Sequence, residues 1–185
     1  MISRLSAVTC TSMLILWLTS PMGFAQPTPY AGQQHREIKA LSSQEVQSYL
    51  SGHGMGFAKA AELNHYPGPM HVLELAEALQ LTEPQRVQTQ AIFDAMRREA
   101  IALGHQLVQA ERRLDHLFAA QTVTEDALQE ATRTIASYWG QVRNVHLRAH
   151  LAQRRVLSPE QIQRYHDLRG YTAPGPNPHP HRHHH

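Results

Sequence analysis

The sequence predicts an all-α protein, an elongated antiparallel helical hairpin with short flanking helices. The first observation behind this is a repeated motif, Leu-Thr-Glu-Pro-Gln at 81–85 and Leu-Ser-Pro-Glu-Gln at 157–161. In each copy the hydroxyl can cap a backbone N–H three residues on while the Gln side chain returns to the cap, which starts a helix. The second is that apolar residues recur at alternating three- and four-residue steps over two long stretches between the copies.

The first 25 residues have the pattern of an export signal. Arg4 is their only charged residue, an apolar run follows at 13–18, and small residues lie at 23–25. This run is shorter than the roughly 20 residues that a spanning helix needs. Cys10 is the only cysteine, so removal of residues 1–25 would leave a chain with neither a disulfide nor a thiolate ligand or nucleophile.

The rest of the chain divides by composition into three parts. Residues 26–41 contain two prolines and a glycine in a mixed polar run and predict a flexible leader. Residues 42–171 carry the helical periodicity and predict one helical domain. Residues 172–185 are rich in His and Pro and form a tail.

The helical domain begins with short helices. The first opens at a further capping box, Ser-x-x-Glu at 42–45. Glycines and prolines then divide the chain repeatedly. We expect short helices over about 42–50, 57–64 and 70–80, separated by the glycine-rich segment 52–56 and by Pro-Gly-Pro at 67–69.

Two long helices follow, from Glu83 to about Ala119 and from the cap Thr124 to about Val156. Gly104 is the only weak position for a helix in the first. Each has one narrow apolar stripe, and the two stripes should face each other. The stripes consist of Ile92, Met96, Ala100, Leu103, Leu107, Ala110, Leu114 and Leu117, and of Leu128, Ala131, Ile135, Tyr138, Val142, Val145, Ala149, Ala152 and Val156.

The length of the first arm has a consequence for assembly. At 1.5 Å per residue it spans about 55 Å, whereas a compact 100-residue domain has a radius of gyration of about 13 Å. An arm of this length needs packing partners from the short helices or a second subunit. We therefore expect a homodimer.

Histidine is the residue in surplus, with 14 among 185 residues. His146 and His150 are one turn apart on the second long helix, so both imidazoles can reach one ion. They lie one residue off the apolar stripe, beside the hairpin seam. Both could equally be boundary residues of a packed helix, because such pairs arise by chance.

His71 and Glu74 share one face at the start of the third short helix. If this helix folds against the hairpin, the two residues join His146 and His150 in a site suited to Zn, Ni, Co or Cu rather than Ca or Mg. The alternative is an ordinary polar helix start. Three other residues face away from the stripe and are interpreted as solvated surface: His105, Asp115 and His116.

The tail offers a second, looser group of imidazoles for a divalent metal. A purification tag usually has an unbroken His run, so the alternation with Pro favours a native tail. The tail candidates are His179, His181, His183, His184 and His185.

Other chemistry is not indicated. Glycines 52, 54 and 56 superficially suggest a phosphate loop, but no strand precedes them and the Gly-Lys-Ser/Thr ending is absent. No nucleophile elbow or carboxylate pair in an apolar setting is evident, so we do not expect an enzyme. The arginines are dispersed without interleaved aromatics, which argues against nucleic acid.

With the two motifs, the long hairpin and the signal peptide, residues 70–171 resemble the Spy/CpxP-like and heavy-metal-resistance family of bacterial periplasmic proteins. The resemblance implies a periplasmic, all-helical protein, often a cradle-like dimer. Family members include ATP-independent chaperones, modulators of stress signalling and metal sensors. The metal-sensing branch has a His-x-x-x-Met pair before the second motif, and here His146 and His150 occupy a similar place with His instead of Met.

These observations predict a metal-binding protein of heavy-metal resistance, metal sensing or envelope stress, with a membrane sensor or regulator as a candidate partner. The alternative is a chaperone that holds unfolded envelope proteins on the inner face of a dimer. Arginines along both arms would ring that apolar face and attract clients in a salt-dependent way.

Overall fold

The computed structural model describes residues 28–171, and every regular element in this range is a helix, which confirms the all-α prediction. No helix between residues 28 and 171 is long and apolar enough to cross a membrane. The signal peptide expected at 1–25 and the tail at 172–185 lie outside the described residues. The elements are η1 (Gln33–His35), α1 (Ser43–Ser51), α2 (Lys59–Glu62), α3 (Pro69–Glu74), α4 (Glu83–Ala119), α5 (Glu125–Val156) and α6 (Pro159–Leu168).

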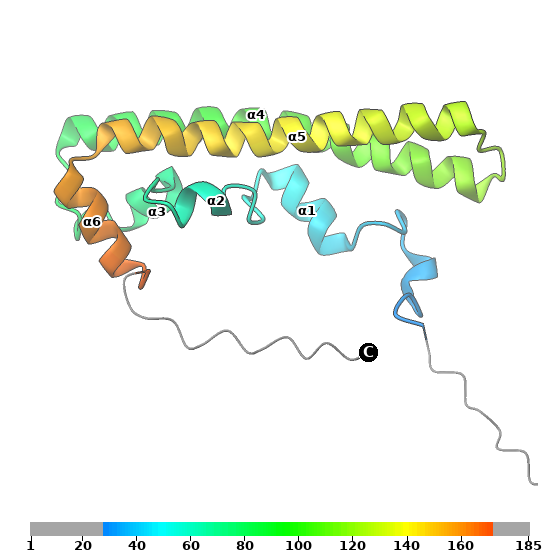
Figure 1. Cartoon of the computed structure of the whole chain (residues 1–185), viewed down its shortest axis with the longest axis horizontal. Helices are drawn as coiled ribbons and strands as arrows, with labels where there is room; N and C mark the ends of the chain where they lie inside the picture. The colour runs from blue at the N-terminus through cyan, green and yellow to red at the C-terminus, as the bar shows by residue number, and fades with distance from the viewer. Residues whose placement is uncertain (1–27, 172–185) are drawn as a thin grey trace, which may run out of the picture. The chain divides into compact units, whose positions relative to one another are not determined.

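Helices α4 and α5 lie side by side as an antiparallel pair (Figure 1). Their bounds are those expected from the stripes and caps. Arg148 Nη2 donates to Glu99 Oε1 at 2.7 Å, and nearer the base of the hairpin Gln153 Nε2 donates to Thr89 Oγ1 at 3.0 Å. Residue numbers rise along one helix as they fall along the other.

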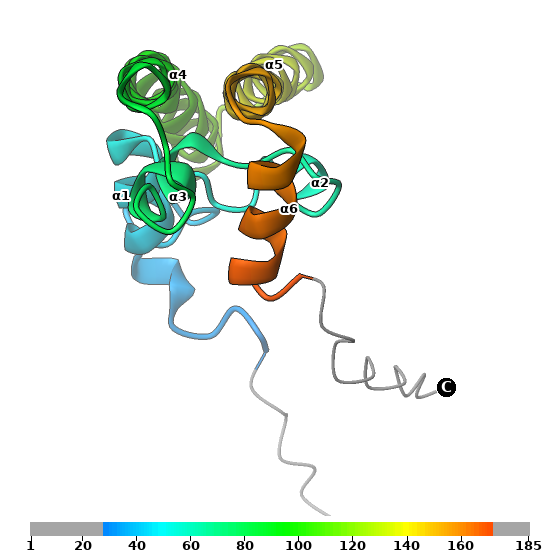
Figure 2. The ribbon, with the colours of Figure 1, turned by 90° about the vertical axis from the view of Figure 1, so that its left-hand side faces the viewer.

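The short helices cover one side of this pair. Helices α1 and α3 contact α4, and α2 contacts α5, as the end-on view shows (Figure 2). Helix α3 ends at Glu74, so the expected helix to residue 80 is wrong in its second half. There the chain forms successive turns, and Gln80 has a φ of 51°. This reversal lets Leu79 and Leu81, on either side of Gln80, both enter the core.

All three expected capping boxes are present. Ser42 with Glu45 opens α1, Thr82 with Gln85 opens α4, and Ser158 with Gln161 opens α6. In each, the hydroxyl accepts from the third backbone N–H and the acidic or amide side chain accepts from the cap N–H. Local hydrogen bonds therefore fix where these helices begin.

The buried residues form two apolar clusters. One lies where α1 and the following loop meet the middle of the hairpin and includes Tyr49, Phe57, Leu107 and Val142. The other lies at the base of the hairpin and contains Val72, Ala76, Leu79, Leu81, Leu157 and Tyr165. The leading Leu of both repeated motifs, Leu81 and Leu157, thus packs in the same cluster.

Part of the segment predicted to be a leader contacts the helical body. Ile38 is 2% exposed and belongs to the first cluster, with residues of α1 and α4. Removing this apolar side chain from water stabilises the contact. Next to it, the Lys39 backbone N–H and ammonium both donate to Asp115. Asp115 was expected to be solvated surface, but its side chain is only 12% exposed. His105 and His116 are exposed.

Gly104 is a point of close approach between helices rather than a weakness. A Cβ added there would lie 2.2 Å from the carbonyl oxygen of Tyr49. Only glycine allows α1 to cross α4 at this distance.

Candidate functional site

A cavity of about 490 Å³ lies between the hairpin and the short-helix segments. Its walls are the glycine-rich loop at 51–56, residues of α2, the start of α3, and the facing surfaces of α4 and α5. The proline break and the glycine-rich loop keep these segments from closing over the hairpin as continuous helix. Three of the four predicted metal ligands of the helical domain, His71, His146 and His150, line this cavity.

His146 is more deeply buried than its expected position beside the seam implied, with 3% exposure. Its ring stacks on Phe57 at 5.9 Å between centroids and 11° between planes. Burial lowers its pKa to about 4, with a smaller effect from the charge of His150, so the ring is neutral at neutral pH. Its Nε2 has no hydrogen-bond partner among the described residues. This nitrogen is a donor atom for a ligand in the tautomer that carries the ring proton on Nδ1.

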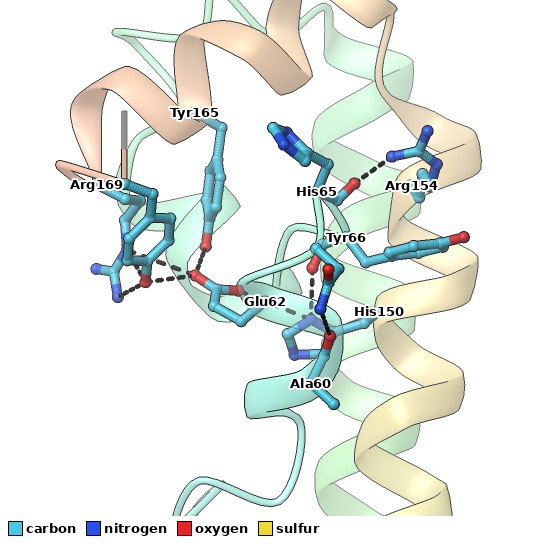
Figure 3. Close-up of polar contacts among 10 residues, drawn as sticks. Ala60, Glu62, His65, Tyr66, His150, Arg154, Tyr165 and Arg169 are labelled. Carbon is cyan, nitrogen blue, oxygen red and sulfur yellow. Dashed lines mark hydrogen bonds and ion pairs between the residues drawn. The ribbon is translucent and has the colours of Figure 1, made fainter. Parts of the chain in front are cut away.

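His150 is oriented by the backbone. Its Nδ1 lies 2.7 Å from the Tyr66 carbonyl oxygen (Figure 3). A carbonyl only accepts, so Nδ1 carries the proton, and in the neutral ring Nε2 carries the lone pair. Burial lowers the pKa of His150, against the raising effects of the Tyr66 carbonyl and Glu62. Such an arrangement, with the far nitrogen held by a carbonyl, is how metal-binding histidines are usually fixed.

Gly68 gives the ring of His150 its space. A Cβ at Gly68 would lie 3.0 Å from Cε1 and 3.1 Å from Nε2 of His150. The Pro-Gly-Pro break therefore lets the loop pass close to the imidazole edge.

Glu62 is a residue of the site that sequence reasoning missed. Its Oε1 accepts from the Tyr165 hydroxyl at 2.6 Å and from the Tyr171 hydroxyl at 3.0 Å. Its Oε2 is buried without a hydrogen bond among the described residues and lies 3.7 Å from His150 Nδ1 (Figure 3). Glu62 thus joins the cavity wall to α6. The four residues come from distant parts of the chain, and no local pattern connects them.

Of His71 and Glu74, only His71 lines the cavity, although the two side chains contact each other. His71 lines the cavity, and its Nδ1 lies 2.9 Å from Glu74 Oε2. Glu74 does not line the cavity, and its side chain is 58% exposed. The expected four-residue set is therefore reduced to three histidines around one space, with Glu74 behind His71. Between residues 28 and 171, no three His, Asp or Glu side chains stand in a ready-made coordination shell.

The cavity has further walls that bear on ligand choice. Met55, Met70 and Met96 line it, as do the cationic residues Lys59 and Arg97. The five tail histidines predicted to bind metal, His179, His181, His183, His184 and His185, lie outside the described residues.

Comparisons with protein-family models, with curated proteins and with solved structures each found no match.

Proposed function

We propose that this protein binds a transition metal ion in the cavity, with Zn, Ni, Co or Cu as candidates, and serves metal resistance, metal sensing or the envelope-stress response without catalysing a reaction. The observation that carries the proposal is the pair His146 and His150, two neutral imidazoles one turn apart on one cavity wall. Neutral imidazole is the form that ligates these metals.

The donor chemistry fits such an ion. Between residues 28 and 171, His146 Nε2 has no hydrogen-bond partner, and His150 is held through its far nitrogen by the Tyr66 carbonyl. His71 from α3 offers a third imidazole in the same cavity. Zinc needs ligand nitrogens at about 2.0–2.1 Å, so binding would require these side chains to rotate toward one another.

A titration tests this proposal. The chain is prepared without residues 1–25 and with the five tail histidines replaced by Ala, so that only the helical domain can bind tightly. Calorimetry with Zn, Ni, Co and Cu should give saturable binding to one site. The double variant His146→Ala, His150→Ala should lose it, whereas the control His105→Ala, His116→Ala, at exposed positions of α4, should keep it. Equal binding by both variants would refute the site.

Location and assembly form part of the same proposal. We infer export to the periplasm with cleavage near residue 25, assembly as a cradle-like homodimer, and membership of the Spy/CpxP-like and heavy-metal-resistance group, all supported by the sequence pattern. Light scattering of the purified protein should give twice the mass of the cleaved chain. A monomeric mass at micromolar concentration would argue against the dimer.

A chaperone role is the second candidate, and one observation favours it. Large apolar side chains are exposed along the hairpin, with Phe118 54%, Trp139 42% and Leu151 48% exposed. The Arg143 guanidinium lies over the Trp139 ring at 5.6 Å, so charge and apolar surface occur together. The protein at an equimolar ratio should then suppress aggregation of a denatured client, less well in high salt. No suppression, with or without metal, would exclude this role.

A further inference from the structure

The methionines of this chain gather around the cavity. The chain has six, and only three follow residue 25: Met55, Met70 and Met96. All three line the cavity that contains His146 and His150. They come from three separate elements, the glycine-rich loop, α3 and α4. Only folding brings them to one place.

These side chains are not ordinary core filling. Met55 is 41% exposed and Met70 is 42% exposed, and none of the three belongs to either apolar cluster. Met55 also has a φ of 42°, a left-handed backbone conformation that costs a residue with a side chain about 1 kcal/mol or more. The next residue, Gly56, also has a positive φ, of 78°, which glycine adopts without that cost. Met55 therefore lines the cavity without being buried in the core, so packing does not account for it.

Ligand softness supplies a reason. Thioether sulfur is a soft, uncharged donor that selects Cu(I) among the biological metals, whereas oxygen donors favour harder ions. Glu62 is the only acid among the described residues that line the cavity, and its Oε1 accepts hydrogen bonds from two tyrosine hydroxyls. The other side-chain donors of the lining include imidazoles and thioethers, which are softer than a carboxylate.

The charge around the cavity points the same way. Lys59 and Arg97 line it and offset the single carboxylate of Glu62. Repulsion by these cations is twice as large for a divalent ion as for a monovalent ion at the same distance. Such a wall therefore favours a cation of charge +1.

We propose that the cavity is a site for a soft monovalent cation, Cu(I) or its analogue Ag(I), held by His146 and His150 together with one or two of the sulfur atoms of Met55, Met70 and Met96. This inference rests on the proposed metal-binding function and names the class of metal that the site prefers. The histidines give the fixed side of the site on α5, and the methionines give the adaptable side.

Silver binding tests the methionines directly. The protein is again the cleaved chain with the five tail histidines replaced by Ala, and the probes are silver nitrate in chloride-free buffer and zinc sulfate. Each methionine methyl carbon is observed by NMR after ¹³C labelling. One equivalent of Ag(I) should shift the methyl signals of the cavity methionines, and zinc should leave them in place. Unshifted methyl signals at saturation with Ag(I) would overturn the inference.

A variant provides the second measurement. Leu replaces Met with similar volume and without the sulfur, and two of the three positions are exposed, so the fold should tolerate the change. The triple variant Met55→Leu, Met70→Leu, Met96→Leu should bind Ag(I) at least tenfold more weakly and Zn unchanged. Silver affinity within twofold of the parent protein would refute a sulfur site. If this variant still binds zinc in that case, the proposed function is not affected. If instead the variant His146→Ala, His150→Ala binds both zinc and silver as the parent protein does, the function itself is refuted.

Discussion

The side-chain amides of Gln85 and Gln161 donate hydrogen bonds to each other's oxygens. Gln85 Nε2 lies 2.8 Å from Gln161 Oε1, and Gln161 Nε2 lies 3.1 Å from Gln85 Oε1. Each amide also donates to a backbone carbonyl that precedes the other motif, Gln85 to Val156 and Gln161 to Leu79. The repeated motif therefore has two tasks. It caps a helix locally, and it joins the two ends of the hairpin.

A double-mutant cycle should measure this link. Gln85→Ala and Gln161→Ala should each destabilise the fold by about 2–3 kcal/mol, because each removes a capping bond and part of the cross-hairpin network. Their effects should couple by about 1 kcal/mol, since the second change finds the network already broken. Urea unfolding followed by circular dichroism gives the values. Glu45→Ala in the capping box of α1, whose carboxylate bonds Ser42, should be additive with either. Additivity of Gln85 with Gln161 would contradict the link.

Two helix glycines should respond in opposite directions to alanine. At Gly104 a methyl group would lie 2.2 Å from the Tyr49 carbonyl oxygen, so α1 must move and stability should fall by about 3 kcal/mol. At Gly140 in α5 an added Cβ meets nothing within 4 Å, so alanine should raise stability by about 0.5–1 kcal/mol through helix propensity. Thermal unfolding of the two variants decides the matter, and a stabilised Gly104→Ala would show that α1 does not cross there.

Stability should fall as the pH is lowered through the range from 6.5 to 4. The pKa of His146 is about 4 in the folded protein and 6.5 in the unfolded chain. Between these two pH values the unfolded chain therefore binds a proton that the folded chain does not. The contribution is fully present above pH 6.5 and reaches a loss of about 3 kcal/mol near pH 4. Burial lowers the pKa of His150 and His166 as well, and adds loss in the same direction.

Urea unfolding at pH 7.5 and pH 5 measures this loss. His146→Gln should show a smaller difference between the two conditions than the parent protein, because it has no titrating ring. His105→Gln, at an exposed position, should show the parent's difference. An unchanged difference in His146→Gln would mean that this ring is not the source.

Losing one partner of the buried hydrogen bond between Thr89 and Gln153 should destabilise the fold more than losing both. Both residues are fully buried, and Gln153 Nε2 donates to Thr89 Oγ1. Thr89→Val keeps the shape but strands the amide, so it should cost about 1–3 kcal/mol. The double change Thr89→Val, Gln153→Leu removes both polar groups and should recover most of that loss. Chemical denaturation of the three variants is the measurement, and a double variant no better than the single would oppose this account.

Local features of the fold could be predicted from sequence, and long-range ones could not. The capping motif and the stripes give the bounds of α4 because hydrogen bonds three or four residues apart determine a helix start and its period. Gly104 was expected to be a weak position of the helix, whereas in the structure it allows α1 to approach α4 closely. This approach is a tertiary contact, which the local sequence does not show. Glu62 was missed since its partners lie 88 to 109 positions away in the chain.

The candidate site divides in the same way. His146 and His150 could be paired from their spacing on one helix. Glu74 does not line the cavity, because helix register shows which residues share a face but not which of them meets a cavity. Met55 could not be placed by any helical period, since it lies in a loop between Gly52 and Gly56, which both have a positive φ.

The buried positions of the hairpin are unevenly distributed. In α4 they run from Thr89 to Ala110 and in α5 from Val142 to Gln153, and no residue from 111 to 141 is buried. Opening the turn end therefore exposes little that folding had hidden, whereas opening the middle and the base of the hairpin breaks both apolar clusters. Amide hydrogens of 112–135 should exchange with solvent through local fraying, and those of Val145 to Gln153 only when the whole domain unfolds. The two helices should thus contain a fast-exchanging and a slow-exchanging stretch. His146 and His150, which line the cavity, lie in the stretch of α5 expected to exchange slowly.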